Sequence, residues 1–553
     1  MKKNWVKPVS ITAVVLAVIL VAFLFRGSIF SGRTGDRIKE LLHLRKKIVV
    51  QNDSTTINGS ELLKKYYDVF GYSQVWTDKQ KENEQYREML IQMFNYADSL
   101  GLERNDYHNH YIVKYDSLSR LPNFDLGMYE YENEVIFTDA ALSFLYNVAY
   151  GKEIKRIEYN GVKYNIDSTR ILNMFSELLV HKDWRRTLDS IEPKISQYLF
   201  LKDELNRMTA VFQQYPFLDS TPAGTGKYIT HLKLTAYGLL PDIPSDDTVS
   251  IELFISAVKQ FQLMNNMDTS GTLDEKKFSE RLNFPIRTRI EQIKESLNCW
   301  RWTGRLKEQE FILVNIPAAR LQIVNRDSVR DMSMRVIVGK TETQTPSFTA
   351  YITRVITYPY WTVPFSISIN EMLPKIIKRV EYLEDNSLQV LNGKGQVIDP
   401  KTVNWRKLSK KYFPYTIRQG TGCDNALGLL KFDLNSPFSI YLHDTNRRDL
   451  FAKSNRFMSH GCVRVEKPME LAHYLLEDDV DSLITNRLDS CVKDQKPEEF
   501  PLKKKFPVLL LYMVADVDEN GNLKFYKDIY EAEEKTPQIS LLKRKFTSKA
   551  LKS

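Results

Sequence analysis

The sequence predicts a multi-domain α+β protein, in which a helical N-terminal half precedes a β-rich C-terminal half. The chain has 553 residues, of which 43% are apolar, so it can form cores for about three to four domains. Apolar residues recur three and four positions apart in 136–150 and 174–180, which is the spacing of amphipathic helices. From Phe311 onward the pattern changes to short runs of β-branched and aromatic residues bounded by Pro, Gly and Asp.

The N-terminus predicts a membrane segment. Residues 1–8 contain three lysines and should remain in the cytoplasm, and residues 9–29 include an apolar run from Ile11 to Phe25. Because no small-residue cleavage site follows that run, we expect an uncleaved anchor, with a signal peptide as the alternative. The remainder of the chain, from about residue 30, should then lie outside the membrane.

Three further regions are expected in the helical half and its connection. Residues 30–220 should form a helical domain, and residues 221–285 a small helical domain that contains the helix-like run 257–262. Thr221 and Tyr228 do not fit a phosphate-binding loop, so the Gly-containing stretch between them is interpreted as a linker. A connecting helix is expected over 286–304.

Residues 305–535 should form the β-rich domain. The runs 311–316, 321–325, 334–338 and 354–358 predict an antiparallel sheet or barrel. A basic, helix-like insertion at 371–422 interrupts them, as a lid over a site often does. A helix is expected from Pro468 to Leu476, followed by a C-terminal hairpin in which the run 506–514 precedes the turn 518–522 and the strand 523–526. The basic tail 536–553 should be disordered.

Chemistry is concentrated in Ser459-His460-Gly461-Cys462-Val463-Arg464, together with His443 upstream. A thiol attacks a carbonyl well only as a thiolate, so a working cysteine needs a base, positive charge and backbone N–H groups for the oxyanion. His443 ends a strand-like run, and Arg464 supplies a fixed charge. The alternative for an isolated pair is a buried apolar thiol and a core histidine. A zinc site is a weaker candidate, because the histidines and cysteines do not have the spacing of zinc ligands. A serine nucleophile is also a weaker candidate, because the two Ser-x-x-Lys matches at 256–259 and 490–493 occur without a Lys-Thr-Gly motif. An exported chain with four cysteines is no disulfide scaffold, although one pair remains possible.

This stretch resembles the active-site signature of the L,D-transpeptidases, in which a His, about fifteen residues, Ser/Thr-His-Gly-Cys and an Arg follow one another. Further similarity lies in Tyr360-Trp361, in the run from Asn425 to Gly428, and, more weakly, in the helical half. The resemblance implies a scaffold domain at 30–220, a peptidoglycan-binding-like domain at 221–285, and a catalytic domain at 305–535 with a capping insertion.

The resemblance also implies a set of site residues. The catalytic group would comprise a nucleophile, its base, an oxyanion-donating glycine and a loop-orienting arginine, namely Cys462, His443, Gly461 and Arg464; the N–H of Cys462 would be a second oxyanion donor. The residues that would support the catalytic group or bind substrate are Ser459, His460, Asp444, Tyr360, Trp361 and Asn425. His460 is the alternative base, but side chains two apart on one loop seldom face each other. Trp361 is interpreted as mainly structural, because large aromatics contribute mostly by burying area.

The implied reaction is two acyl transfers through a Cys462 thioester, which release D-Ala and form 3→3 crosslinks between peptidoglycan stem peptides, without metal or organic cofactor. The enzyme would work in the cell envelope on the periplasmic side, contribute to cell shape, and be a carbapenem target. Nucleic acid could explain the basic runs at 375–379 and 406–411, but an anionic wall or membrane surface explains them equally well. No nucleic-acid partner is expected. Alternatives are an L,D-carboxypeptidase, transfer to another amine, or a non-catalytic wall-anchoring protein.

Overall fold

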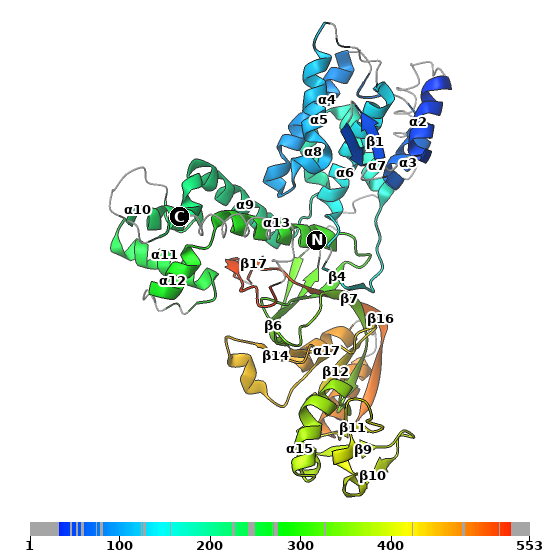
Figure 1. The fold of residues 1–553 in the computed structure, drawn as a ribbon, viewed down its shortest axis with the longest axis vertical. Coiled ribbons are helices and arrows are strands. Elements are labelled where there is room, and N and C mark those ends of the chain that lie inside the picture. The colour runs from blue at the N-terminus through cyan, green and yellow to red at the C-terminus, as the bar shows by residue number, and fades with distance from the viewer. Residues whose placement is uncertain are drawn as a thin grey trace, which may run out of the picture. The chain divides into compact units, whose positions relative to one another are not determined.

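A computed structural model describes residues 32–531, except for short gaps at 45–46, 51–52, 57–59, 73, 78–80, 123, 125–128, 155, 224–226, 242–248, 268, 270–274, 326–327, 423, 478–481 and 519. The predicted membrane segment at 9–29 and the basic tail at 536–553 lie outside the described residues. Within the described part, no helix is long and apolar enough to cross a membrane. The described residues form two compact units (Figure 1): unit 1 comprises those within 32–154, 164–307 and 515–525, and unit 2 those within 156–163, 308–514 and 526–531.

Unit 1 is mainly helical, as the apolar spacing predicts. Its helices are α2 (Gly32–Leu44), α3 (Ser60–Phe70), α4 (Lys81–Asn95), α5 (Asn109–Ser119), α6 (Glu130–Tyr150), α7 (Ser168–His181), α8 (Trp184–Ile191), α9 (Ser196–Gln214), α10 (Lys227–Ala236), α11 (Ile251–Met264), α12 (Glu275–Leu282) and α13 (Ile286–Thr303), and β1 (Lys47–Val50) pairs with β2 (Asp53–Thr56). The predicted helices at 136–150, 174–180 and 257–262, and the connecting helix, are confirmed by α6, α7, α11 and α13. α6 is buried on almost all sides, so it forms the centre of the first helical layer.

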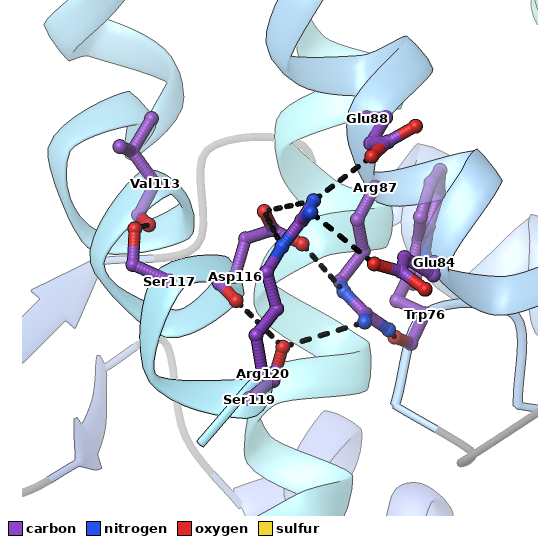
Figure 2. A network of polar contacts seen from close by, with 9 residues as sticks. All are labelled: Trp76, Glu84, Arg87, Glu88, Val113, Asp116, Ser117, Ser119 and Arg120. Carbon is purple, nitrogen blue, oxygen red and sulfur yellow. Dashed lines mark hydrogen bonds and ion pairs between the residues drawn. The ribbon is translucent and has the colours of Figure 1, made fainter. Parts of the chain in front are cut away.

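Buried polar contacts hold the first helices of unit 1 together (Figure 2). Arg87 on α4 donates from Nε to Asp116 on α5 at 3.1 Å and from Nη1 to the carbonyl of Trp76 at 2.6 Å. Arg120 extends the network to Glu88 at 2.9 Å. Because every partner here is itself satisfied, the network can be buried without the cost of an orphaned charge. We assign it a structural role.

The small helical part of unit 1 consists of α10, α11 and α12. Its core is a row of edge-to-face aromatic contacts, with Tyr237 5.0 Å from Phe261 and Phe261 5.3 Å from Phe278 between ring centroids. The fold of this part is thus helical, in the order expected for residues 221–285.

The C-terminal hairpin differs from the sequence prediction. The strands that pair are β17 (Ala515–Val517) and β18 (Leu523–Phe525), whereas the preceding apolar run belongs to β16 (Glu498–Leu511). The hairpin also belongs to unit 1, although the sequence places it in the catalytic domain. The physical reason is its packing: Ser296 on α13 donates to the carbonyl of Ala515 at 2.5 Å, and the ring of Phe525 packs edge-to-face against that of Tyr237.

Unit 2 is built around a closed β-barrel. The ring runs β12 (Leu430–Leu434), β13 (Leu442–His443), β15 (Val463–Val465), β6 (Ser328–Gly339), β5 (Arg320–Asn325), β4 (Glu310–Asn315), β16 and β7 (Phe348–Thr357), and β12 pairs with β7 to close it. Two short strands lie outside this ring: β3 (Tyr159–Asn160) pairs with β7, and β14 (Phe457–Ser459) pairs with β6. The predicted β-rich runs are confirmed. Closure removes unpaired edges, because each strand of the ring has two neighbours.

Of the two predicted arrangements, an antiparallel sheet or a barrel, the structure has the barrel, and its pairing is not antiparallel throughout. Strands β13 and β15 are parallel, as are β4 and β16, β14 and β6, and β3 and β7. Parallel pairing needs a crossover connection, which a local reading of the sequence does not reveal. The helices α17 (Pro468–Leu476), as predicted, and α18 (Ser482–Lys493) place Leu471, Leu475 and Leu488 in the barrel's apolar core.

A separate small layer, the cap, is inserted between β7 and β12. Its four-stranded sheet has the order β10 (Val397–Ile398), β9 (Leu388–Leu391), β11 (Thr416–Gln419) and β8 (Trp361–Thr362), and its helical segments are α14 (Phe365–Ile367), η5 (Ser368–Met372), α15 (Leu373–Lys378) and α16 (Tyr382–Asp385). It has a core of its own around Ile376, Val390 and Ile417. Because β8 pairs with β11, the cap begins at Trp361, earlier than the predicted boundary at residue 371.

Candidate active site

Four side chains form a compact patch where β13 and β15 run side by side. The parallel register places Leu442 opposite Val463 and His443 opposite Arg464. One step earlier, the N–H of Val463 donates to the carbonyl of Tyr441 at 3.1 Å, which brings Tyr441 beside Cys462. Since side chains alternate along a strand, Tyr441 and His443 share one face with Cys462 and Arg464.

This patch lines a cavity of about 770 Å³. The nucleophile-motif residues Ser459, His460, Cys462 and Arg464 contribute to its wall, as does His443. On the side of the cap, the wall includes Trp361, Glu371, Lys375 and Tyr382. The cavity thus takes its lining from two parts of unit 2 that are distant in sequence.

The electrostatic environment keeps His443 neutral. Burial and the nearby charge of Arg464 lower the pKa of its imidazole to about 3, and Lys431 on the neighbouring strand β12 acts in the same direction. Lys431 lies opposite His443 in the register of β12 and β13, so cationic residues flank the histidine on both sides. A neutral imidazole can accept a proton at physiological pH.

The thiol of Cys462 is also uncharged in the resting site. Burial raises its pKa, while the backbone and hydroxyl of Tyr441 and the charges of Lys431 and Arg464 oppose that rise. Its Sγ donates to the carbonyl of Ser439, with the two atoms 3.6 Å apart. The phenol of Tyr441 has its own pKa raised by burial and by Cys462, so it stays protonated and can donate toward sulfur. The nucleophile and base candidates are therefore both neutral before reaction.

A tight loop presents Cys462. The hydroxyl of Ser459 donates to the carbonyl of Cys462 at 2.6 Å and accepts from the N–H of Gly461 at 3.1 Å. Thr345 supports the loop from outside, because its Oγ1 donates to the carbonyl of Gly461 at 2.8 Å. Gly461 has φ +113°, a conformation that L-residues rarely adopt.

One predicted role of Gly461 is corrected by this geometry. Its N–H is already bonded to Ser459, so it is not a free oxyanion donor. The N–H of Cys462, in contrast, has no hydrogen-bond partner among the described residues. Gly461 therefore contributes through its backbone conformation, and the oxyanion donor that the loop leaves available belongs to Cys462.

Asp444 and Asn425 organise the loop that precedes β12. The Asp444 carboxylate is buried and accepts from the N–H of Leu429 and from Arg448, at 2.9 and 2.8 Å. The carboxylate is therefore directed to this loop, while the backbone of Asp444 interacts with the imidazole of His443 and opposes the lowering of its pKa. Asn425 donates to the carbonyl of Pro359 at 3.0 Å and accepts from the N–H of Leu427 at 2.7 Å. Its position is that of a loop organiser outside the cavity wall, whereas Leu427 lines the cavity.

The two aromatic candidates lie in different places. Trp361 lines the cavity and also packs against the core of the cap, so it combines the two roles weighed from the sequence. Tyr360 is half exposed, lies 4.5 Å from the guanidinium of Arg418, and is not part of the cavity wall. Tyr360, unlike Trp361, therefore lies outside the wall of this cavity.

His460 connects the loop of residues 459–462, named here the nucleophile loop after its candidate nucleophile Cys462, to the cap. Its Nε2 lies 2.5 Å from the carboxylate of Glu371, which belongs to the π-helical turn η5. This direction takes the imidazole toward the cap. The structure thereby favours His443, which shares a face with Cys462, over His460 as the candidate base.

Sequence reasoning missed Tyr441, Lys431, Glu371 and Thr345. Tyr441 had a usable signal, since it stands two residues before His443 in the same strand-like run and must share its face. The other three enter the site through strand pairing and loop contacts. Arg464 was predicted, but its situation was not: burial lowers its pKa, and its buried Nε has no hydrogen-bond partner among the described residues.

The other cysteines and the potential metal ligands of the described residues give no second candidate site. Among the described residues, Cys299, Cys462 and Cys491 form no disulfide, and Cys423 lies outside the described residues. Across the part of the chain that is described, no group of three His, Cys, Asp or Glu side chains could hold a metal ion.

Comparison with known proteins finds family models that match two parts of the chain. Residues 309–485 match the family model of the L,D-transpeptidase catalytic domain, YkuD, and residues 61–205 match that of the scaffold domain. A "Putative L,D-transpeptidase" from Haemophilus influenzae is 37% identical over 219 residues, which are 40% of this chain and 44% of the relative. A solved structure, of the Ldtfm-avibactam carbamoyl enzyme, aligns with 12% identity and a TM-score of 0.17, covering 39% of this chain and 61% of the other.

The helical unit 1 and the β-rich unit 2 agree with the two matched domains, and the matched catalytic segment includes both His443 and Cys462. The matched part spans less than half of the curated relative's length. The chain thus contains a YkuD L,D-transpeptidase catalytic domain at 309–485 and a scaffold domain at 61–205.

Proposed function

We propose that this protein is a peptidoglycan L,D-transpeptidase that uses Cys462 as its nucleophile and His443 as its base. The observation that carries the proposal is the patch of Tyr441, His443, Cys462 and Arg464 in the wall of one large cavity. A nucleophile, a neutral base and fixed positive charge are together the minimum set for covalent acyl transfer.

The first half-reaction begins from a neutral pair. The thiol transfers its proton to the imidazole of His443 while Sγ attacks the carbonyl of the third, diamino-acid residue of a tetrapeptide stem. The C–S bond forms, and the carbonyl oxygen becomes an oxyanion, to which the N–H of Cys462 donates. Arg464 and Lys431 stabilise the negative charge. When the oxyanion collapses, the C–N bond to the terminal D-Ala breaks and the imidazolium returns its proton to the leaving amine.

The second half-reaction uses an amine from a neighbouring stem. The neutral amine attacks the thioester carbonyl, His443 takes the proton that the amine loses, and the C–S bond breaks to regenerate the thiol. The product is a 3→3 crosslink, and one D-Ala has been released per crosslink. Water in place of the amine yields a tripeptide, which is the L,D-carboxypeptidase alternative.

The cell envelope, on the side of the membrane where peptidoglycan lies, is the compartment that this substrate requires. A non-catalytic wall-anchoring protein is the alternative from another class. The depressed pKa of His443 beside a cavity-lining thiol supports catalysis over anchoring, because purely structural residues need no such pairing.

Mass spectrometry of muropeptides tests the proposal. The protein is incubated with disaccharide tetrapeptide, alongside Cys462→Ala and, as a matched control, Cys491→Ala, which removes a buried thiol outside the cavity. A crosslinked dimer that has lost one D-Ala, formed by wild type and by the control but not by Cys462→Ala, supports the proposal. Tripeptide alone would shift the assignment to carboxypeptidase.

Failure to form any Cys462-dependent product, with either meso-diaminopimelate or lysine stems, would contradict the enzyme assignment. Incubation with a carbapenem supplies a second measurement. We expect a covalent adduct on Cys462, visible as a mass increase of the intact protein that is absent in Cys462→Ala.

A further inference from the structure

A second cavity, of about 400 Å³, adjoins the one described above. The two cavities share Pro364, Ser439 and Tyr441 in their walls, so they meet beside the proposed nucleophile. The second cavity continues along the cap, between β8, β11 and the start of α14. It has no part in the mechanism given above.

The chemical character of the two cavities differs. The first contains cations and carboxylates, including Lys375, Arg464, Glu371 and Asp424. The second is lined, among the described residues, by no Lys, Arg, His, Asp or Glu. A charged peptide stem therefore suits the first cavity, and an uncharged ligand suits the second, because a charge placed there would lose solvation without gaining a partner.

Three aromatic rings form one side of the second cavity. Phe365, which is 51% exposed, lies 6.2 Å from Phe413 at an interplanar angle of 76°, and Phe413 lies 6.2 Å from Tyr415 at 89°. These rings belong to the cap, and they leave aromatic surface uncovered in a concave site. Exposed aromatic surface of this kind usually marks a binding site.

Hydroxyl groups form the remainder of the lining. The hydroxyls of Thr362, Tyr415, Thr416 and Ser439 have no hydrogen-bond partner among the described residues. Neutral hydroxyls can donate and accept, so they match a ligand that carries hydroxyl and amide groups in turn. An uncharged wall with both aromatic rings and free hydroxyls is complementary to a pyranose ring, which has an apolar C–H face and polar edges.

We propose that this second cavity binds an uncharged N-acetylated pyranose of the glycan to which the stem peptide is attached. The inference rests on the proposed function, because it uses the stem in the first cavity to bring the sugar to the second. Three stem residues span on the order of 10 Å when extended. A stem whose third residue reaches Cys462 can therefore run past Tyr441 and place its sugar against Phe365 and Phe413.

A binding experiment tests the site without requiring catalysis. N,N′-diacetylchitobiose, a neutral disaccharide of N-acetylated sugars, is titrated into the full chain and followed by saturation-transfer NMR. Phe365→Ala removes one ring of the cavity, and Tyr412→Ala is the matched control, because Tyr412 is a 63% exposed aromatic of the same cap outside the cavity wall. We expect Phe365→Ala to weaken binding about three- to tenfold, and Tyr412→Ala to bind like wild type.

A kinetic experiment tests the link to the reaction. Turnover of disaccharide tetrapeptide is compared with turnover of the same tetrapeptide without sugars. We expect wild type to show a lower KM for the glycosylated substrate, and Phe365→Ala to lose most of that advantage, while kcat changes less than KM. Tyr415→Phe, which deletes only a hydroxyl, should lose part of the advantage with little risk to folding.

The two proposals fail in different ways. Absence of chitobiose binding to wild type, or equal effects of Phe365→Ala and Tyr412→Ala, would overturn the sugar site whatever the activity. Equal slowing of glycosylated and sugar-free substrates by Phe365→Ala would also overturn it, and would indicate a site for the acceptor peptide. Loss of turnover on both substrates in wild type, with chitobiose bound, would instead overturn the transpeptidase assignment alone.

Discussion

His443 and Arg464 lie directly opposite each other in the parallel pairing of β13 and β15. A permanent cation therefore stands beside the proposed base, and a second, Lys431, is its neighbour on the other side. Both disfavour an imidazolium, so the histidine remains neutral until the thiol gives up its proton. The same two cations favour the thiolate of Cys462. During proton transfer from sulfur to nitrogen, their attraction to the negative charge on sulfur and on the substrate oxygen therefore offsets their repulsion of the imidazolium.

The pKa of His443 predicts an acid-sensitive fold. Its value of about 3 lies below the ordinary 6.5, so the unfolded chain binds a proton first as the pH falls. The free energy of unfolding should therefore decrease below pH 6.5, by about 2 kcal/mol between pH 7 and pH 5 from this group. In His443→Gln that part of the loss should disappear, as urea unfolding at several pH values would reveal. His473→Gln, at an exposed histidine, is the control, and an unchanged pH dependence in His443→Gln would contradict the prediction.

Ser459 should be essential for the shape of the nucleophile loop. Ser459→Ala leaves the buried N–H of Gly461 without its acceptor, which costs about 1–3 kcal/mol of stability and displaces Cys462. Ser459→Thr retains the hydroxyl and should keep most of the activity. Denaturant unfolding and the rate of Cys462 alkylation measure the two effects. Equal behaviour of the alanine and threonine variants would show that the hydroxyl is dispensable.

Gly428 should tolerate no side chain. It has φ +63°, and a Cβ there would lie 2.5 Å from the carboxyl group of Asp444. Gly428→Ala should therefore destabilise by more than about 2 kcal/mol, since it combines backbone strain with loss of the Asp444 contacts. Gly395→Ala is the matched control in the cap, where φ is +76° and the space is open, so about 1 kcal/mol is expected. Thermal unfolding compares them, and equal costs would show that the contact with Asp444 is not limiting.

The ion pair of His460 and Glu371 should act locally. Both side chains are partly exposed, so Glu371→Gln is expected to change global stability by no more than about 1 kcal/mol. Hydrogen exchange should nevertheless become faster in η5 and in the nucleophile loop, because their connection is weakened. Glu381→Gln, at an exposed glutamate of the cap, is the control. Unchanged exchange in both segments would contradict a role for the pair in holding the cap.

The sequence predicted the units of this fold well where the signal is local. The period of three to four residues identified α6 and α7, and the apolar runs identified β4, β5, β6 and β7, because each pattern reflects one element burying one face. The motif around Cys462 likewise stood out by residue type alone. The predictions that were wrong concern pairing: antiparallel pairing throughout the sheet and the hairpin partner of 523–525 both depend on how the strands meet in the folded chain.

What the sequence by itself determined is the chemical inventory: a thiol, an imidazole, a guanidinium and the loop glycine that presents the thiol. What only the tertiary structure decided is their mutual geometry. The parallel register of β13 and β15 puts His443, and not His460, on the face of Cys462, and it surrounds the histidine with Lys431 and Arg464. The same folding consumes the N–H of Gly461 and turns Asp444 toward its own loop. The physical reason is that pKa values and hydrogen-bond partners depend on neighbours in space, which the closed barrel selects from separate strands and loops.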